Sequence, residues 1–137
     1  WVQVRDGRMM AVKMTDDLKS AAGEPFELFR ASSRPGAARD PKRHHITDGP
    51  WLERTAKGEL LMYWSSTSST GYAVYVTRSE SGRLAGPWGP HKKIDSIKDG
   101  GHGMVFRTFD GESKFIYHQP NGPEHLKRAK YDIIGVL

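Results

Sequence analysis

The sequence contains no cysteine among its 137 residues. A disulfide framework and a thiolate metal site are therefore excluded for this chain. No apolar run approaches the roughly 18 residues of a membrane span, so we expect no membrane partner. Helical periodicity is also scarce, because 15 glycines and 8 prolines interrupt nearly every window long enough for a helix.

Lysine and arginine number 21 against 16 acidic residues, which gives a net charge of +5. The densest basic clusters, PKRHH at 41–45 and HLKRAK at 125–130, are short and hold no aromatic residue on which a base would stack. We therefore interpret the positive charge as ordinary solvated surface and expect no nucleic-acid partner.

Short runs of β-branched and aromatic residues recur between turn signals and predict strands. They are WVQV, RMMAVKM, PFELFR, WLERT, ELLMYWS, GYAVYVTRS, MVFRTF, SKFIYHQ and AKYDIIGVL. Nine candidate strands without a confident helix indicate an all-β protein.

Two internal alignments suggest a repeated unit. At an offset of 53, Arg54-Thr55 falls on Arg107-Thr108 and Gly58-Glu59 on Gly111-Glu112, each followed by an aromatic strand. At an offset of 62, MAVKMTDD falls on YAVYVTRS and GEPF on AGPW. Together these segments describe a unit of about 50 to 60 residues that contains four strands and ends in a Gly-x-Pro-aromatic strand.

Four antiparallel strands repeated at this period are typical of a β-propeller blade. We predict one partial propeller over 1–137, with the end of one blade at 1–31, a connection at 32–45, a complete blade at 46–94 and most of a further blade at 98–137. These are about two and a half blades, whereas propellers typically close with four to eight. A β-sandwich with chance repeats is the alternative.

The offset of 53 places Asp48 opposite Gly101 and Gly49 opposite His102. The first strand of each blade lines the central channel, so we expect Asp48 and His102 to converge there. A carboxyl group and an imidazole held together can perform acid–base chemistry or help to bind a cation. The alternative is that Asp48 only forms the turn before Gly49-Pro50.

Several strings resemble the C-terminal part of glycoside hydrolase family 43. They are ITDGPWL, LLMYWSS, GYAVYVTRSESGRLAGPW, DGGHGMVFRTFDG and YHQPN, and MAVKMTDDLKSAAGEPFELFRAS resembles the end of the preceding blade. The resemblance implies a five-bladed propeller that hydrolyses arabinose- or xylose-containing polysaccharides with inversion of configuration.

Asp48 matches the family's general acid, with a side chain one methylene shorter than the usual glutamate. Such a group protonates the departing sugar oxygen, while a base roughly 6.5 to 9.5 Å away activates water. His102 matches the family's channel histidine, which helps to hold a calcium ion through water. Oxygen ligands must supply most of that shell, because calcium prefers oxygen to imidazole.

The resemblance also suggests residues that contact the sugar. Trp51 and Trp64 are candidate platforms for apolar sugar faces, with a place in the core as the alternative, which is favoured for Trp64. His118 ends an inner strand and is a candidate for the pocket. Arg128 is a weak match to a basic residue of the final blade.

The blades that carry the base and the tuning aspartate in the family have no counterpart in this sequence. An isolated half-propeller exposes apolar sheet faces, so we predict a homo-oligomer or a complementing chain that closes the ring. The function expected is glycoside hydrolysis that depends on carboxylates outside the matched motifs. The alternatives are a non-catalytic carbohydrate-binding propeller fragment and a protein-interaction propeller.

Overall fold

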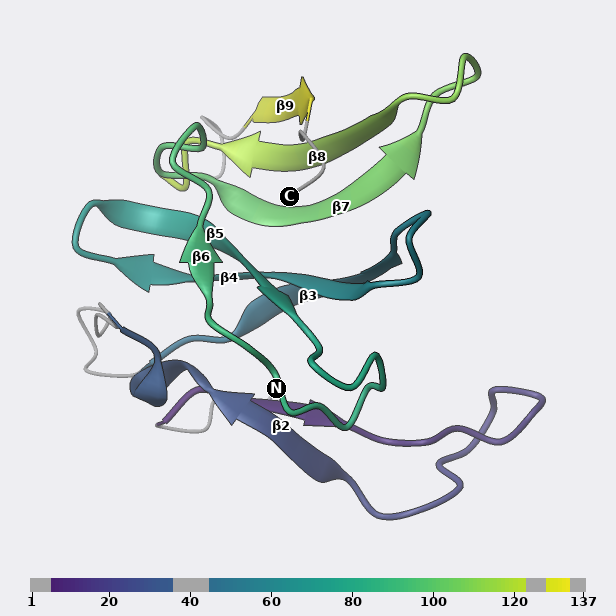
Figure 1. Cartoon of the computed structure of the whole chain (residues 1–137). Coiled ribbons are helices and arrows are strands. Elements are labelled where there is room, and N and C mark those ends of the chain that lie inside the picture. The colour runs from purple at the N-terminus through teal and green to yellow at the C-terminus, as the bar shows by residue number, and fades with distance from the viewer. Residues whose placement is uncertain (1–5, 36–44, 123–127, 134–137) are drawn as a thin grey trace.

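The computed structural model describes residues 6–35, 45–122 and 128–133, and consists of three antiparallel sheets stacked on one another (Figure 1). The first sheet contains β1 (Arg8–Ala11) and β2 (Phe26–Arg30). The middle sheet contains, in order, β3 (Asp48–Arg54), β4 (Leu60–Ser68), β5 (Gly71–Arg78) and β6 (Lys92–Lys93). The last sheet contains β7 (Gly101–Arg107), β8 (Ser113–Gln119) and β9 (Arg128–Ile133).

The described residues form no α-helix, and their one helical segment is the short 3-10 turn η1 (Ala31–Ser33). No helix among them is long and apolar enough to cross a membrane. The prediction of an all-β protein is therefore confirmed. The predicted strand WVQV lies outside the described residues, as does the end of the last predicted strand after Ile133.

The predicted final strand of the middle sheet is wrong in its position. The Gly-Pro-Trp segment contributes only one bridge, between Trp88 and Ser79, and the fourth strand is the two-residue β6. Proline has no N–H to give to a ladder, so Pro87 and Pro90 on either side of Trp88 limit pairing there.

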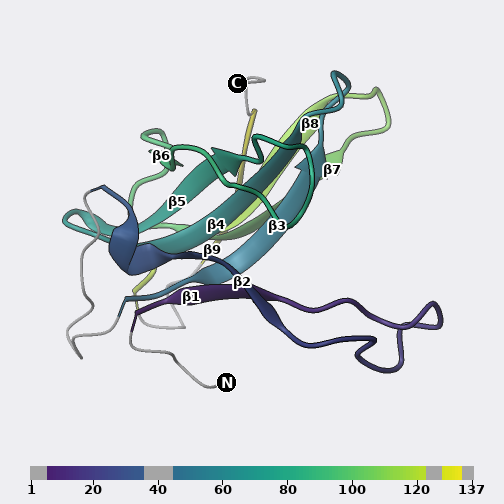
Figure 2. The same ribbon diagram turned by 60° about the horizontal axis from the view of Figure 1, so that its bottom comes forward.

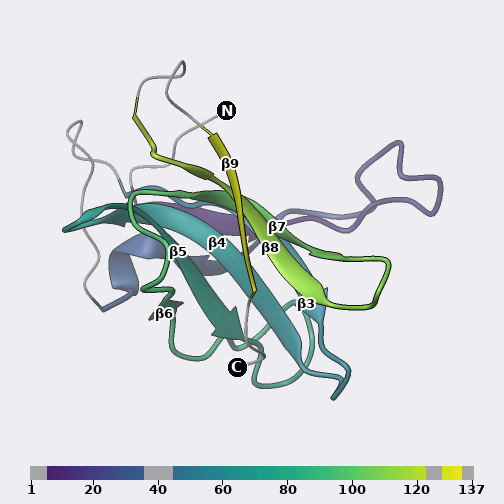
Figure 3. The same ribbon diagram turned by 90° about the horizontal axis from the view of Figure 1, so that it is seen from above.

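The middle sheet is covered on both faces, as Figure 2 shows with β1 and β2 turned forward and Figure 3 shows with the last sheet seen from above. Every residue from Leu60 to Ser66 in β4 is consequently buried. In β8 only one face is covered, and buried Phe115 and Tyr117 flank the more exposed Ile116. Side chains alternate along a strand, so this pattern identifies the face that packs on the middle sheet.

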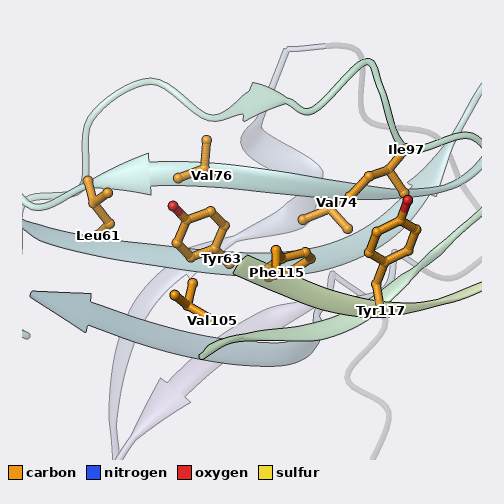
Figure 4. Packing of buried hydrophobic residues seen from close by; sticks show 8 residues of the cluster. All are labelled: Leu61, Tyr63, Val74, Val76, Ile97, Val105, Phe115 and Tyr117. Atoms are coloured by element: carbon orange, nitrogen blue, oxygen red, sulfur yellow. The ribbon is translucent and has the colours of Figure 1, made fainter. Parts of the chain in front are cut away.

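One hydrophobic cluster joins the middle and last sheets (Figure 4). Its largest fully buried member is Phe115, whose ring lies 5.2 Å from that of Tyr63. The cluster consists of Leu61, Tyr63, Val74, Val76, Ile97, Val105, Phe115 and Tyr117.

A second cluster joins the first and middle sheets and is centred on Trp64. The indole has no exposed surface, packs 5.1 Å from the Phe29 ring and 5.2 Å from the Tyr75 ring, and donates its N–H to Nδ1 of His91. The prediction that Trp64 is a sugar platform is therefore wrong. Its strand lies between two covering sheets, which leaves no face of the ring open to a ligand.

The first strands of the middle and last sheets, β3 and β7, lie in contact with each other. Each pairs with the second strand of its own sheet, and neighbouring sheets thus meet at their first strands as well as face to face. A two-sheet sandwich does not have this arrangement, whereas the blades of a propeller bring their first strands together around an axis.

Candidate functional site

Asp48 and His102 stand at the starts of β3 and β7 and meet where these strands adjoin. Oδ1 of Asp48 lies 3.2 Å from Nδ1 of His102, with about a third of the Asp48 side chain and half of the His102 side chain exposed. The predicted convergence of the two residues is confirmed. One proton suffices to bridge these atoms, carried either by the carboxyl group or by the imidazole.

The same backbone irregularity brings both residues to this point. Pairing is interrupted between Asp48 and Trp51 in β3 and between Gly101 and Met104 in β7, positions that differ by 53 in both cases. Within the two interruptions, Gly49 has φ of +50° and His102 has φ of +52°. The repeat inferred from the sequence is thus present in the backbone.

The Asp48 carboxyl group accepts hydrogen bonds at both oxygens. Oδ1 accepts the backbone N–H of Gly49 at 3.0 Å, and Oδ2 accepts the hydroxyl of Tyr72 at 2.8 Å. Burial, followed by the charge of Asp48, raises the pKa of Tyr72, so that this phenol stays protonated and donates. Asp48 is therefore more than a turn residue, because it is bonded to a side chain of another strand.

Tyr72 belongs to a polar group at this end of the sheets. Its ring stacks on His118 at 5.7 Å with an angle of 16° between the planes, and its N–H donates to Oδ1 of Asp99. Nε2 of His118 lies 2.9 Å from Oδ1 of Asn121, whose own N–H bonds to Oδ2 and the carbonyl oxygen of Asp99. The site therefore draws on β3, β5, β7, β8 and the loops that flank them.

Two solved structures of glycoside hydrolases resemble this chain. No family model matches the chain, and no curated protein matches it. Among solved structures, an endo-arabinase from Bacteroides thetaiotaomicron VPI-5482 superposes on the whole chain with a TM-score of 0.89 and 32% sequence identity. A thermostable family-43 glycoside hydrolase matches 91% of the chain with a TM-score of 0.66 and 20% identity.

The fold is that of the family-43 glycoside hydrolases. The chain spans 49% of the length of the endo-arabinase and 43% of that of the second structure. It is a partial β-propeller, as the repeats predict, and about half of the length of these two relatives has no counterpart in it.

Three further candidate residues, Trp51, Arg128 and His118, remain predictions in their roles. Trp51 is half-buried and packs against the cluster between the middle and last sheets, and its indole N–H has no partner among the described residues. Arg128 lies on β9 opposite Gln119, and only its backbone position is described. The contact of His118 with sugar is likewise a prediction, since its described contacts are to Tyr72 and Asn121.

The residues at this site do not by themselves fit a calcium ion. No group of three or more His, Asp or Glu side chains converges within the part of the chain that the structure describes. Nδ1 of His102 is engaged with Asp48, and calcium requires six or more oxygen ligands. Calcium in the channel stays a prediction that needs oxygen ligands beyond this cluster.

Sequence reasoning missed Tyr72, Asp99 and Asn121. A tyrosine at the start of a strand is common for packing reasons alone, and Tyr72 becomes visible as a site residue only when its hydroxyl is found on Asp48. Asp99 begins an Asp-Gly-Gly segment, which the sequence alone predicts to be an ordinary turn, and its φ in the structure is +47°.

Proposed function

We propose that the chain belongs to an enzyme that hydrolyses arabinofuranosyl or xylosyl linkages of plant polysaccharide with inversion of configuration. The observation that carries the proposal is the contact of Asp48 with His102 at the first strands of neighbouring sheets, within a family-43 fold. The substrate class is supported by the likeness to an endo-arabinase over the whole chain.

In this proposal Asp48 is the proton donor. Its side chain is partly exposed, so a glycosidic oxygen can approach it, and the interrupted pairing after Asp48 turns it out of the regular ladder. As the bond to the sugar breaks, the Asp48 proton moves to the leaving oxygen. A carboxylate on the opposite face of the sugar removes a proton from the attacking water. That base and a further tuning acid lie outside the matched motifs.

Hydrolysis of aryl arabinofuranosides and aryl xylosides by the purified protein tests the proposal. We expect Asp48→Asn to abolish turnover of phenyl glycosides, whose leaving group needs a proton, and to keep sugar binding, because the amide fills the same space without a proton to deliver. Asp95→Asn is the matched control, since Asp95 is 80% exposed and pairs only with Lys93 among the described residues. Equal activity of the Asp48→Asn variant and the wild type would refute the role of Asp48.

A non-catalytic carbohydrate-binding protein is the second candidate, in which Asp48, already an acceptor of hydrogen bonds at both oxygens, would hold sugar hydroxyl groups. It predicts sugar binding without turnover in every assembled form of the protein. The titration of arabino- and xylo-oligosaccharides by calorimetry, beside the hydrolysis assay, separates the two candidates. A protein-interaction propeller predicts no sugar binding at all.

We also propose that the ring is closed by further copies of the chain or by a complementing chain. The first sheet exposes Met10 and Phe26, and the outer face of the last sheet exposes the cross-strand pair Met104 and Ile116, each by more than a third. Exposed apolar faces of this kind favour association. Sizing in solution is the test, and a well-folded monomer would contradict the proposal.

A further inference from the structure

The hydroxyl of Tyr72 reaches Asp48 across an intervening strand. Tyr72 lies in β5 and Asp48 in β3, and β4 separates these two strands in the middle sheet. The β4 residue opposite Asp48 is Ser65, a small side chain over which the phenol extends to Oδ2 of Asp48. Tyr72 is buried, with 8% of its surface exposed, so its hydroxyl depends on protein partners rather than on water.

The Tyr72 ring is held by contacts on two sides, and its backbone by a third. His118 stacks on the ring, and Gly101 provides the space for it, because a Cβ at Gly101 would lie 2.5 Å from Cε1 of Tyr72. The backbone N–H of Tyr72 donates to Oδ1 of Asp99. A ring held in this way presents its hydroxyl in one direction.

The direction of the hydrogen bond between Tyr72 and Asp48 follows from the protonation of the phenol. Burial raises the pKa of Tyr72, so its hydroxyl keeps its proton and donates it to Oδ2 of Asp48. Ser65 Oγ, between the two strands, accepts the backbone N–H of His102 at 2.9 Å. Oδ2 of Asp48 is therefore an acceptor in this arrangement.

We propose that Tyr72 is a positioning residue that keeps one oxygen of Asp48 as a permanent acceptor, so that only the oxygen beside His102 gains or loses a proton. That second oxygen, Oδ1, lies next to the exposed imidazole, on the side from which a ligand can approach. When the proton has left, the Tyr72 hydroxyl stabilises the carboxylate that remains. The catalytic consequence rests on the proposed role of Asp48 as proton donor, whereas the hydrogen bond itself does not.

The first test is spectroscopic and requires no substrate. A buried, hydrogen-bonded tyrosine hydroxyl exchanges slowly enough for its proton to be followed by NMR, and its absence in Tyr72→Phe assigns the signal. We expect Asp48→Ala to shift or abolish this signal, and Asp95→Ala to leave it unchanged. An unchanged Tyr72 signal in Asp48→Ala would overturn the proposal.

The second test uses the hydrolysis of two arabinofuranosides, one with a dinitrophenyl and one with a phenyl leaving group. A dinitrophenolate leaves without protonation, whereas phenol needs the acid. We expect Tyr72→Phe to lower kcat on the phenyl glycoside roughly tenfold with KM unchanged, and to leave the dinitrophenyl glycoside nearly unaffected. A merely structural role would lower both alike, and that result would overturn the proposal.

The two proposals fail in different ways. If Asp48→Asn loses the same activity on both glycosides, Asp48 is not the proton donor and the proposed function fails, while the NMR test still decides the hydrogen bond. If Asp48→Asn is selective for the phenyl glycoside and Tyr72→Phe is not, the proposed function stands and the role of Tyr72 is refuted.

Discussion

Gly49 and His102 share one backbone conformation at equivalent places of two sheets, and they lie against each other. Their φ angles are +50° and +52°, and a Cβ added to Gly49 would lie 2.9 Å from Cα of His102. Glycine adopts this left-handed region without cost, whereas a residue with a side chain does so at a cost of about 1 kcal/mol or more. His102 therefore occupies a position that suits glycine, which favours a functional reason for the imidazole.

This strain predicts an unusual order of stability among variants of His102. Alanine normally stabilises a protein relative to glycine, but at φ of +52° we expect His102→Gly to be more stable than His102→Ala by about 1 kcal/mol. Both changes remove the imidazole and its contact with Asp48, so each is the control for the other. Urea unfolding measures the difference. If His102→Ala is instead the more stable variant, the backbone at residue 102 is not left-handed.

Close approach of the two strands predicts that Gly49 does not tolerate a side chain. We expect Gly49→Ala to lower the free energy of unfolding by roughly 2 to 4 kcal/mol, from backbone strain and from the clash with His102. Gly58→Ala is the matched control, because Gly58 also has a positive φ, of +82°, but no atom lies within 4 Å of the added Cβ. Its expected cost is about 1 kcal/mol, and equal losses in the two variants would argue against the contact.

The fold and the Asp48–His102 contact could be predicted from the sequence because both depend on local patterns. Strands follow from alternating β-branched and aromatic residues. The offset of 53 aligns two chain segments in which the equivalent residues Gly49 and His102 have nearly the same φ angle. Tyr72 could not be found in this way, since its partner lies across another strand and depends on the absence of a side chain at Gly101. The burial of Trp64 depends on the first sheet, which packs over it from a distant part of the sequence.

His91 predicts a pH dependence of stability that is separate from the site. Burial, and then the positive charge of Arg34, lowers the pKa of His91 to about 4 from 6.5. Neutral His91 accepts the Trp64 N–H at Nδ1, and protonation would remove this acceptor and place a cation beside Arg34. Below pH 6.5 the unfolded chain binds the proton first, so His91 makes folding less favourable as the pH falls from about 6.5 to about 4.

We expect this effect to lower the free energy of unfolding by roughly 1 to 3 kcal/mol across that interval. His91→Asn keeps a hydrogen-bond acceptor and does not titrate, so its stability should fall less over the same pH range. Denaturant unfolding at several pH values compares the two proteins. If the free energy of unfolding depends on pH in the same way for the wild type and for His91→Asn, His91 is not the source of the pH dependence.

Two adjacent residues of β8 test the packing of the last sheet on the middle one. Phe115 is 1% exposed within the cluster that joins these sheets, and Ile116 is 37% exposed on the opposite face. We expect Phe115→Ala to cost about 3 to 5 kcal/mol, because it removes a buried ring and leaves a cavity beside Tyr63. Ile116→Ala in the isolated chain should cost about 1 kcal/mol or less. If Ile116→Ala is as costly as Phe115→Ala under conditions in which the protein associates, the outer face of the last sheet is buried in the assembly, as a closed propeller requires.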